Sequence, residues 1–508
     1  MARRARMMDH DLIVVGAGAS GLGAVRAAQW AGADVALVSD SAPGGDCTFT
    51  GCVPSKTLLA AARDGLDFAA AMARVRAAVE HIAATESAEV LTSRGVTVIE
   101  GRARLITHDT VAVGDRRITA PRILVATGSK PSLPDIAGLA DARPLTTETV
   151  FELAEAPESL GIIGGGATGC ELAQAFALLG VEVTLFESRH QLLSGEEAEA
   201  AATVGAALQA DGVTVLLPAE VVRVEPAERG RDGGPYSLSY QPASGEHHAA
   251  PRGGVTDPRS LSGGTGGSVA VDRLLVAAGR EPATVGLGLQ EMRLKLGEQP
   301  GHVLTDERLQ TSVRGVYAAG DVAAWRVRPA GRPMWRPRRG QRQFHASVNL
   351  SHAADEMGRI AAGNALGKGL RGRFRHELVP RVVFTDPEVA SVGLTPSGAP
   401  PGSRVAYLPL AEVDRAVTDG RTDGFIAIVA GPRRLLRNAG GGRILGATIV
   451  APRAGEMIGE IVLAMRTGAF TGRLAQTSHA YPTFSSGVQK AAAQFFGEIE
   501  GRRARRAG

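Results

Sequence analysis

The chain has 508 residues, of which 44% are hydrophobic, so it is long enough for about two to four domains with apolar cores. Its formal net charge is only +4, and much of the basic excess lies at the two ends, which favours solvated tails over nucleic-acid binding. The three cysteines exclude the disulfide framework of a small secreted protein, and no apolar run approaches the roughly 18 residues of a membrane span, so we expect a cytoplasmic chain with neither a nucleic-acid nor a membrane partner.

A dinucleotide-binding pattern begins the chain. The apolar run 11–15 predicts a buried strand, which leads into Gly16-Ala17-Gly18-Ala19-Ser20-Gly21, a helical segment and a second strand at 35–38. In this context a GxGxxG sequence lets the backbone approach a pyrophosphate at a helix N-terminus. The second strand ends in Ser39, where a ribose-binding carboxylate is usual, and we expect the adjacent Asp40 to substitute. The predicted cofactor-binding residues here are Gly16, Gly18, Gly21 and Asp40.

Two of the three cysteines, Cys47 and Cys52, precede an apolar helical pattern. Pro54 suits the first turn of a helix, which places Cys52 at its N-terminus, where the dipole favours a thiolate. A disulfide needs Cα atoms about 4.4 to 6.8 Å apart, so we expect Cys47 on a loop that folds back. Lys56 lies four residues after Cys52 and shares its helix face. The pattern favours a redox pair, and two buried, inert cysteines are the alternative.

The next segments complete the first dinucleotide unit. An alanine-rich amphipathic stretch at about 67–90 predicts a helix, and 123–128 predicts a strand that ends in Ala-Thr-Gly before a proline-rich segment. We expect the chain to leave the first domain there, with a boundary near residue 150.

The same unit then repeats. The apolar run 160–163 leads into Gly164-Gly165-Gly166-Ala167-Thr168-Gly169, a helix and a strand that ends in Glu187. A second fingerprint predicts a second dinucleotide, with Gly164, Gly166 and Gly169 at its phosphates. A carboxylate at Glu187 accepts ribose hydroxyls and repels a 2′-phosphate, which favours NADH over NADPH. Arg189 and His190 keep NADPH open, because cations placed there can accommodate the phosphate.

Two stretches after this unit lack regular patterns. The range 229–268 is rich in Gly, Ser, Pro and His, and we predict that its middle is a disordered loop. The range 325–343 is rich in arginine and tryptophan, and we favour a solvated insertion over a patch for nucleic acid or an acidic partner. Between them, 274–280 closes the second domain, and the strand 316–321 ends in a Gly-Asp pair that suits the polar middle of a dinucleotide.

The C-terminal part changes character. After a helical stretch at 350–366, strands are predicted at 382–384, 425–429 and 444–450, followed by an amphipathic helix at 457–467. This α+β pattern has no nucleotide signature, so we expect an assembly module.

Taken in order, these motifs resemble the class I flavoprotein disulfide reductases, the family of dihydrolipoamide dehydrogenase, glutathione reductase and mercuric reductase. The resemblance covers nearly the whole chain. It is carried by the two fingerprints and by five further segments: Gly44-Gly45-Asp46-Cys47-Thr48-Phe49-Thr50-Gly51-Cys52-Val53-Pro54-Ser55-Lys56, Ala318-Ala319-Gly320-Asp321, Phe384-Thr385-Asp386-Pro387-Glu388, Ala454-Gly455-Glu456-Met457-Ile458 and His479-Ala480-Tyr481-Pro482-Thr483.

The resemblance implies an α/β fold with two Rossmann-like domains, for FAD and NAD(P), and a C-terminal α+β dimerisation domain. The implied divisions are an FAD-binding part with the redox cysteines at 1–150, an NAD(P)-binding domain at 151–278, a central FAD-binding part at 279–376, a dimerisation domain at 377–500 and a basic tail at 501–508. The family forms homodimers whose active sites are completed by the partner subunit.

By the same resemblance, hydride passes from NAD(P)H to FAD, and the electrons then reduce the cysteine disulfide. Cys52 is then the thiolate in contact with the flavin and Cys47 the thiol that exchanges with substrate. Lys56 pairs with Glu171 beside the flavin ring, which suits a buried lysine because it keeps its charge only with a partner. Further residues implied at the cofactors are Thr127, Gly128, Ser129, Gly279 and Asp321, and no metal site is implied.

The chain departs from the family where disulfide-reducing members carry a histidine and a glutamate. Those positions are Tyr481 and Ser486 here, and a tyrosine of pKa about 10 is a poor base at pH 7. Tyr481 can still donate a hydrogen bond, and His479 either rescues the proton transfer in part or has a structural role. Ala167 stands where glutathione reductase-like members have an aromatic gate, which leaves the nicotinamide face open.

A tyrosine at this position is similar to mercuric reductase, but no C-terminal cysteine pair for metal delivery and no N-terminal metal-binding domain are seen here, so specific mercury handling is not expected. We predict a homodimeric, FAD-dependent oxidoreductase that transfers electrons from NADH to the Cys47 and Cys52 pair, with dihydrolipoamide dehydrogenase as the nearest activity. The alternatives are an NAD(P)H-dependent reductase of quinones or metal ions, and a redox-sensing flavoprotein without catalysis.

Overall fold

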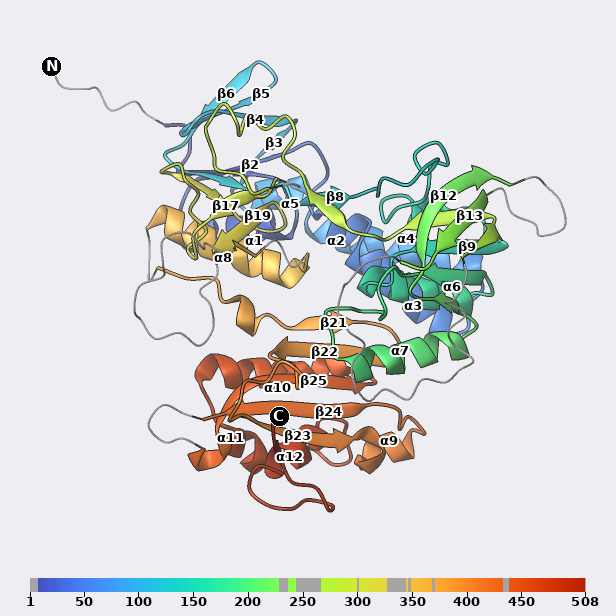
Figure 1. Cartoon of the computed structure of the whole chain (residues 1–508). Coiled ribbons are helices and arrows are strands. Elements are labelled where there is room, and N and C mark those ends of the chain that lie inside the picture. The colour runs from blue at the N-terminus through green and yellow to red at the C-terminus, as the bar shows by residue number, and fades with distance from the viewer. Residues whose placement is uncertain are drawn as a thin grey trace. The chain divides into compact units, whose positions relative to one another are not determined.

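A computed structural model describes residues 8–227, 236–243, 266–298, 301–326, 344–345, 349–367, 371–432 and 438–507. The chain forms two compact units, which are described separately below (Figure 1). The first unit comprises Met1–Thr57, Ala73–Ser132 and Gly279–His376, and the second comprises Leu58–Met72, Leu133–Ala278 and Glu377–Gly508.

The first unit is built on a parallel five-stranded sheet with the order β18-β7-β1-β2-β3. Strands β1 and β2 are buried along their whole length, as their continuous apolar runs predict. The strands are β1 (Leu12–Val15), β2 (Val35–Ser39), β3 (Thr97–Glu100), β7 (Ile123–Val125) and β18 (Val316–Ala318).

Three smaller sheets complete this unit. One is antiparallel and consists of β4 (Ala103–Thr107), β5 (Thr110–Val113) and β6 (Arg116–Thr119). A two-stranded ladder pairs β8 (Ser129–Pro131) with β16 (Arg280–Pro282), and the last sheet consists of β17 (Val303–Thr305), β19 (Ala323–Arg326) and β20 (Phe344–His345).

Two helices of the first unit, α1 (Ala19–Trp30) and α8 (Ser351–Leu366), pack with their backbones in close contact. A Cβ atom added at Gly358 would lie 1.9 Å from the Ser20 carbonyl oxygen, and one at Gly23 would lie 2.7 Å from the Asp355 carbonyl oxygen. Glycine is therefore required at both positions for this crossing. The helices that carry or follow the cysteines are α2 (Gly45–Phe49), α3 (Cys52–Arg63), α4 (Phe68–Thr85) and α5 (Ala88–Ser93).

The second unit repeats the parallel arrangement in a four-stranded sheet of order β11-β10-β9-β15. Its strands are β9 (Ser159–Ile163), β10 (Glu182–Phe186), β11 (Thr214–Leu216) and β15 (Arg273–Val276), and its helices are α6 (Ala167–Leu178) and α7 (Ala198–Ala210). An antiparallel sheet of β12 (Glu220–Pro226), β13 (Tyr236–Gln241) and β14 (Gly267–Val271) accompanies it.

The C-terminal part of the second unit is a six-stranded antiparallel sheet of order β21-β22-β25-β24-β23-β26. The strands are β21 (Arg381–Val383), β22 (Glu388–Gly393), β23 (Arg404–Pro409), β24 (Phe425–Gly431), β25 (Arg443–Ala451) and β26 (Arg505–Arg506). Four helices belong to this part: α9 (Asp414–Thr418), α10 (Ala454–Thr467), α11 (Thr471–Gln476) and α12 (Ser486–Ala493).

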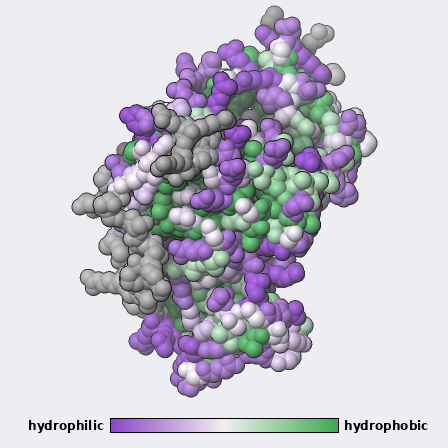
Figure 2. Space-filling model, turned by 90° about the vertical axis from the view of Figure 1, so that its right-hand side faces the viewer, coloured by the Kyte–Doolittle hydropathy of each residue, from purple (hydrophilic) through white to green (hydrophobic). Residues whose placement is uncertain are grey.

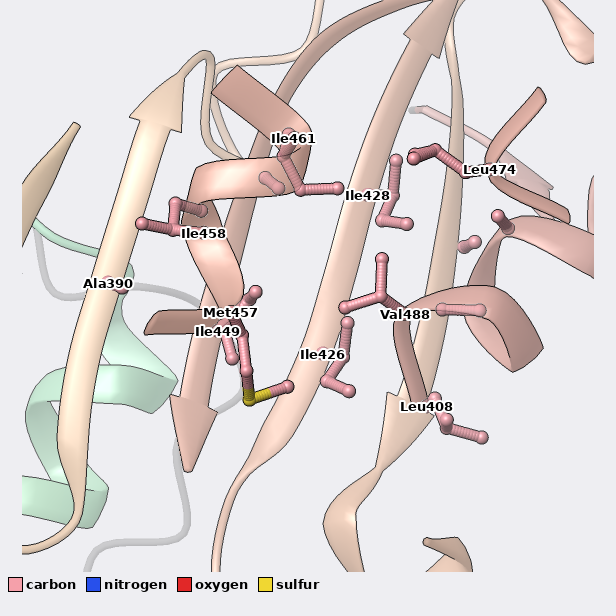
Figure 3. Packing of buried hydrophobic residues seen from close by; sticks show 14 of the residues in the cluster. Ala390, Leu408, Ile426, Ile428, Ile449, Met457, Ile458, Ile461, Leu474 and Val488 are labelled. Atoms are coloured by element: carbon pink, nitrogen blue, oxygen red, sulfur yellow. The ribbon is translucent and has the colours of Figure 1, made fainter. Parts of the chain in front are cut away.

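A single apolar core joins this sheet to its helices. Figure 3 shows Met457, Ile458 and Ile461 of α10 beside side chains from the central strands, including Ile426 and Ile449. All of these side chains are buried, as the alternating strands and the amphipathic helix predicted from the sequence require.

Three sequence predictions need correction. The range 229–268 contains the strands β13 and the start of β14, where Leu238 is fully buried, while 228–235 and 244–265 lie outside the described residues. Trp325 is not part of a solvated insertion, because it is 1% exposed on β19, and 327–343 lies outside the described residues. The tail is not wholly solvated, since Arg505 and Arg506 form the edge strand β26.

Among the described residues, no helix is both long enough and apolar enough to cross a membrane. The face in Figure 2 shows hydrophilic residues interspersed with groups of hydrophobic ones. Exposed large apolar side chains of the C-terminal part include Val417, Leu463 and Phe496. Side chains of this kind are typical of subunit contacts.

Candidate redox and dinucleotide-binding sites

The first glycine fingerprint forms a tight turn between β1 and α1. A Cβ at Gly16 would lie 2.4 Å from the Ala126 carbonyl oxygen, and one at Gly21 would lie 1.9 Å from the Gly16 carbonyl oxygen. Gly18 precedes the first helical residue, and no side chain caps the helix there. The two outer glycines therefore permit the turn, and the middle one leaves the helix amides open to a ligand.

The second fingerprint repeats this geometry between β9 and α6. A Cβ at Gly164 would lie 2.6 Å from the Ala277 carbonyl oxygen, and one at Gly169 would lie 1.9 Å from the Gly164 carbonyl oxygen. Gly166 is the N-cap of α6, also without a side-chain cap, and a Cβ added there would meet nothing within 4 Å. Both turns thus fit the pyrophosphate of a dinucleotide, as FAD and NAD(P)H require.

A buried hydroxyl supports the same fit in the first unit. Ser20 Oγ, in the first turn of α1, is buried and has no hydrogen-bond partner among the described residues. A buried polar atom without a partner calls for an explanation, and a ligand at the helix N-terminus supplies one. The residues present therefore suit a phosphate-bearing cofactor.

The acidic residue expected at the end of the second strand is present in only one of the two fingerprints. Glu187 follows β10, and its carboxylate accepts hydrogen bonds from the Gly165 amide at 2.8 Å and from the Arg189 amide at 2.8 Å. The equivalent position in the first unit is Ser39, because the Val38 and Phe186 carbonyls make the same bonds to the fingerprints. Asp40 is exposed one residue farther on, so its role at a ribose stays a prediction.

The cysteine pair lies at the junction of two helices. Cys52 is the first residue of α3, as predicted, but Cys47 lies in the short helix α2 and not on a loop. Gly51 makes the sharp connection, since a Cβ there would lie 2.8 Å from the Asp46 carbonyl oxygen. Both cysteines are half-buried thiols.

A serine of another helix contacts the pair. Ser351, the first residue of α8, has its Oγ 3.3 Å from Cys52 Sγ. The Cys52 sulfur thus lies at the start of α3 and beside the start of α8, and both helix dipoles favour a thiolate there. The sequence gave no signal for Ser351, because 299 residues separate it from Cys52.

The two thiols are not equivalent. The hydrogen bond with the Cys52 side chain, burial and the charge of Cys52 raise the pKa of Cys47. The first thiolate of the pair is therefore carried by Cys52, and Cys47 stays protonated and donates to it. This division matches the roles implied by the family resemblance.

Several predicted cofactor residues of the first unit are connected. Ser129 Oγ donates to Asp321 Oδ2 at 2.9 Å, and Thr127 Oγ1 donates to the Ala283 carbonyl at 2.8 Å. Gly128 and Gly279 adopt positive φ angles of 70° and 151° on either side of the β8–β16 ladder. This ladder brings the Ala-Thr-Gly segment and the Gly-Asp segment to one place, as a shared dinucleotide site requires.

Glu171 is buried in α6, with 4% of its surface exposed, and its Oε1 accepts a hydrogen bond from the Phe384 amide at 2.9 Å. The neighbouring Gln174 exchanges hydrogen bonds with the Asp386 backbone at 2.7 and 3.0 Å. Helix α6 therefore fixes the Phe-Thr-Asp-Pro segment. Lys56 belongs to the first unit, so its pairing with Glu171 stays a prediction.

The histidine that was considered as a substitute base has both ring nitrogens engaged. His479 Nε2 lies 2.9 Å from Glu460 Oε2, and Nδ1 lies 2.9 Å from the Thr477 carbonyl oxygen. Its side chain is only 8% exposed. This geometry favours the structural role over a proton shuttle. The sequence analysis did not include Glu460, although α10 places it on the helix that packs near His479.

Tyr481 is held differently. Its side chain is 74% exposed, and its hydroxyl donates to Asp414 Oδ2 at 2.7 Å. This bond raises the pKa of Tyr481, so the phenol is a still weaker base at neutral pH. Ser486 Oγ donates to the Thr483 carbonyl at 2.6 Å and supplies no carboxylate. Asp414 was not expected from sequence.

Two family models match the chain: "Pyridine nucleotide-disulphide oxidoreductase" over residues 10–349 and its dimerisation domain over residues 379–492. A dihydrolipoyl dehydrogenase of Thermus scotoductus is 32% identical, covering 96% of this chain and 97% of the relative. A mercuric reductase of Streptomyces lividans is 31% identical with coverages of 96% and 97%. Among solved structures, the HOCl-induced flavoprotein disulfide reductase RclA from Escherichia coli has a TM-score of 0.75 at 26% identity, covering 95% of this chain and 99% of that one.

Proposed function

Because the chain belongs to the pyridine nucleotide-disulphide oxidoreductase family, we propose that it passes electrons from NADH through FAD to the Cys47 and Cys52 pair. Members of this family are FAD-dependent enzymes that use NAD(P)H, and the dimerisation domain implies a homodimer. The nearest named activity is dihydrolipoamide dehydrogenase, which several listed relatives carry.

The observation that carries this proposal is the environment of Cys52. Its sulfur lies at the first residue of α3 and 3.3 Å from Ser351 Oγ at the start of α8, while Cys47 remains a thiol that donates to it. A thiolate held in this way at helix N-termini is suited to redox exchange, and buried structural cysteines lack such groups. When bound, FAD would take a hydride from the nicotinamide and deliver its electron pair to the disulfide.

The residues of the chain then have separate tasks in the proposed reaction. Cys52 retains the negative charge after the disulfide opens, and Cys47 takes up a proton. The two uncapped helix N-termini at Gly18 and Gly166 bind the phosphates of FAD and of the nicotinamide nucleotide. Lys56 and Glu171 form the ion pair beside the flavin that the family resemblance implies.

We propose NADH as the preferred nucleotide. The Glu187 carboxylate is fixed by two backbone amides, with one oxygen directed to the fingerprint loop at Gly165 and the other to Arg189. A fixed negative charge at this place accepts ribose hydroxyls and repels a 2′-phosphate. The Arg189 side chain instead hydrogen-bonds Ser194.

The motif around Tyr481 favours a second candidate for the acceptor. Disulfide exchange by Cys47 needs a base, but its pKa is raised, the Tyr481 phenol is protonated and both nitrogens of His479 have protein partners. A quinone or metal ion that takes electrons from flavin or thiols does not need this base. We therefore propose that such acceptors are reduced faster than lipoamide.

The domain assignment is part of the proposal. It gives FAD to 1–150 and 279–376, the nicotinamide nucleotide to 151–278, and subunit assembly to 377–500, with each active site completed by the partner subunit. A turnover panel of lipoamide, glutathione disulfide, mercuric ion and quinones, each with NADH and NADPH, tests the acceptor and the nucleotide together. Turnover with none of them would favour a redox-sensing flavoprotein without catalysis.

A further inference from the structure

An acidic residue occupies the position immediately before the exchanging cysteine. Asp46 lies in α2 next to Cys47, and the turn that precedes it packs on the first fingerprint. The Gly44 amide donates to the Ala17 carbonyl at 2.9 Å, and a Cβ at Gly45 would lie 2.6 Å from the Gly18 Cα. Asp46 is therefore close in the chain both to the redox sulfur and to the turn where phosphates are expected.

A carboxylate in this position opposes the chemistry proposed for the site. Negative charge near Cys47 disfavours a thiolate, and negative charge near the fingerprint turn disfavours a pyrophosphate. Each effect weakens when a cation neutralises the carboxylate. The relevant question is therefore which cation faces Asp46.

Arg280 supplies that cation. Its guanidinium forms an ion pair with Asp46, its Nε donates to Ser129 Oγ at 2.7 Å, and its Nη2 donates to the Ser129 carbonyl at 2.8 Å. Ser129 in turn donates to Asp321. The Arg280 side chain is 22% exposed, so solvent screens this pair less than a surface pair.

The neighbouring ion pair in the same ladder provides a contrast. Lys130 and Glu281 face each other across β8 and β16, with Nζ and Oε1 3.0 Å apart, and both side chains are at least 40% exposed. Arg280 and Pro131 are the adjacent pair of that ladder. A clamp for the ladder alone would make these two cations equivalent, whereas only Arg280 is printed in contact with the residue beside Cys47.

We propose that Arg280 is a positioning residue of the redox site: it neutralises Asp46 and ties it to Ser129 and Asp321, so that FAD binds and the cysteine pair ionises next to it. This inference rests on the proposed function, because it assumes FAD at the first fingerprint. It assigns roles to two residues, Asp46 and Arg280, that the family motifs leave without one.

Four variants of the full-length protein test the proposal. Arg280→Met leaves the Asp46 charge unbalanced, Asp46→Asn removes that charge, and the double variant removes both. Lys130→Met is the matched control, because it removes a cation from the same ladder. The first measurement is FAD affinity, from quenching of cofactor fluorescence on titration of the apoprotein. The second is the rate at which iodoacetamide alkylates Cys47 and Cys52 in the reduced holoprotein, followed by peptide mass spectrometry.

We expect Arg280→Met to bind FAD about fivefold more weakly and to be alkylated about fivefold more slowly than wild type. Asp46→Asn is expected to be alkylated at least as fast as wild type, and the double variant to recover most of both losses. Lys130→Met is expected to match wild type within about twofold.

Equal behaviour of Arg280→Met and Lys130→Met would overturn the proposal, and so would a double variant as impaired as Arg280→Met. If Arg280→Met does not fold, slower alkylation and weaker FAD binding in Asp46→Asn would overturn it equally. A wild-type protein that binds no FAD refutes the proposed function itself, so the two failures are distinguishable.

Discussion

Ser351 offers the sharpest test of how the chain prepares its redox pair. Its hydroxyl lies 3.3 Å from Cys52 Sγ and donates to the sulfur once that sulfur is a thiolate. A hydrogen bond to a charged group contributes about 1.5 to 3 kcal/mol, and about 1.4 kcal/mol corresponds to one pH unit. Because the cysteines are partly exposed, we take the lower end, so Ser351→Ala removes about one pH unit of thiolate stabilisation.

The sign follows from which form is stabilised. Loss of a donor to the thiolate raises the pH at which the pair ionises, so the midpoint of the pH dependence of alkylation moves upward by about one unit. At pH 7 the reduced holoprotein then reacts with iodoacetamide about tenfold more slowly. The matched control is Ser93→Ala, whose hydroxyl bonds only the Val90 carbonyl of its own helix end. A midpoint that is unchanged, or that moves to lower pH, refutes this account of Cys52.

Three further predictions concern specificity, catalysis and stability. In Glu187→Gln we expect kcat/KM for NADH to fall about tenfold relative to NADPH, and an unchanged ratio of the two would contradict the role of the carboxylate. Tyr481→His combined with Ser486→Glu should raise lipoamide turnover by about tenfold or more, whereas no gain would show that the missing base is not the limit. Gly424→Ala should lower the free energy of unfolding by about 2 kcal/mol or more, because its Cβ would lie 2.1 Å from the Val450 carbonyl oxygen, and urea unfolding against Gly402→Ala, which has open space, separates this clash from backbone strain alone.

The sequence predicted those parts of the fold that local geometry determines. Both fingerprints were found because a turn that brings the Gly16 and Gly164 backbones against a neighbouring strand accepts no side chain there. The start of α3 at Cys52 followed from Pro54 and from the apolar pattern after it. Strands β1 and β2 were found because they are buried on both faces.

Composition misled where a few residues decide the structure. Strand β13 alternates Tyr236, Leu238 and Tyr240 with serines, but the glycine- and serine-rich sequence around it outweighed this short pattern. Trp325 is a core residue that packs edge-on against Phe374, with ring centroids 4.9 Å apart, although arginines follow it in the sequence. A local average of composition cannot separate one buried residue from its polar neighbours.

The site itself was predicted in its motifs and missed in its contacts. Ser351 beside Cys52, Arg280 beside Asp46 and Asp414 beside Tyr481 are all joined across long stretches of chain. Such contacts depend on how the strands and helices pack, and no single sequence encodes them as a spacing. They are also the contacts that decide which thiol ionises and which base is available.

The central claim is that electrons from NADH reach the Cys47 and Cys52 pair through FAD. Anaerobic titration of the holoprotein with NADH, with iodoacetamide added at each step and peptides then analysed by mass spectrometry, tests it directly. We predict that the protein takes up twice the electrons that FAD alone accepts, and that both cysteines become alkylated only as NADH is consumed. Uptake limited to FAD, with alkylation of the two cysteines independent of NADH, would contradict the claim.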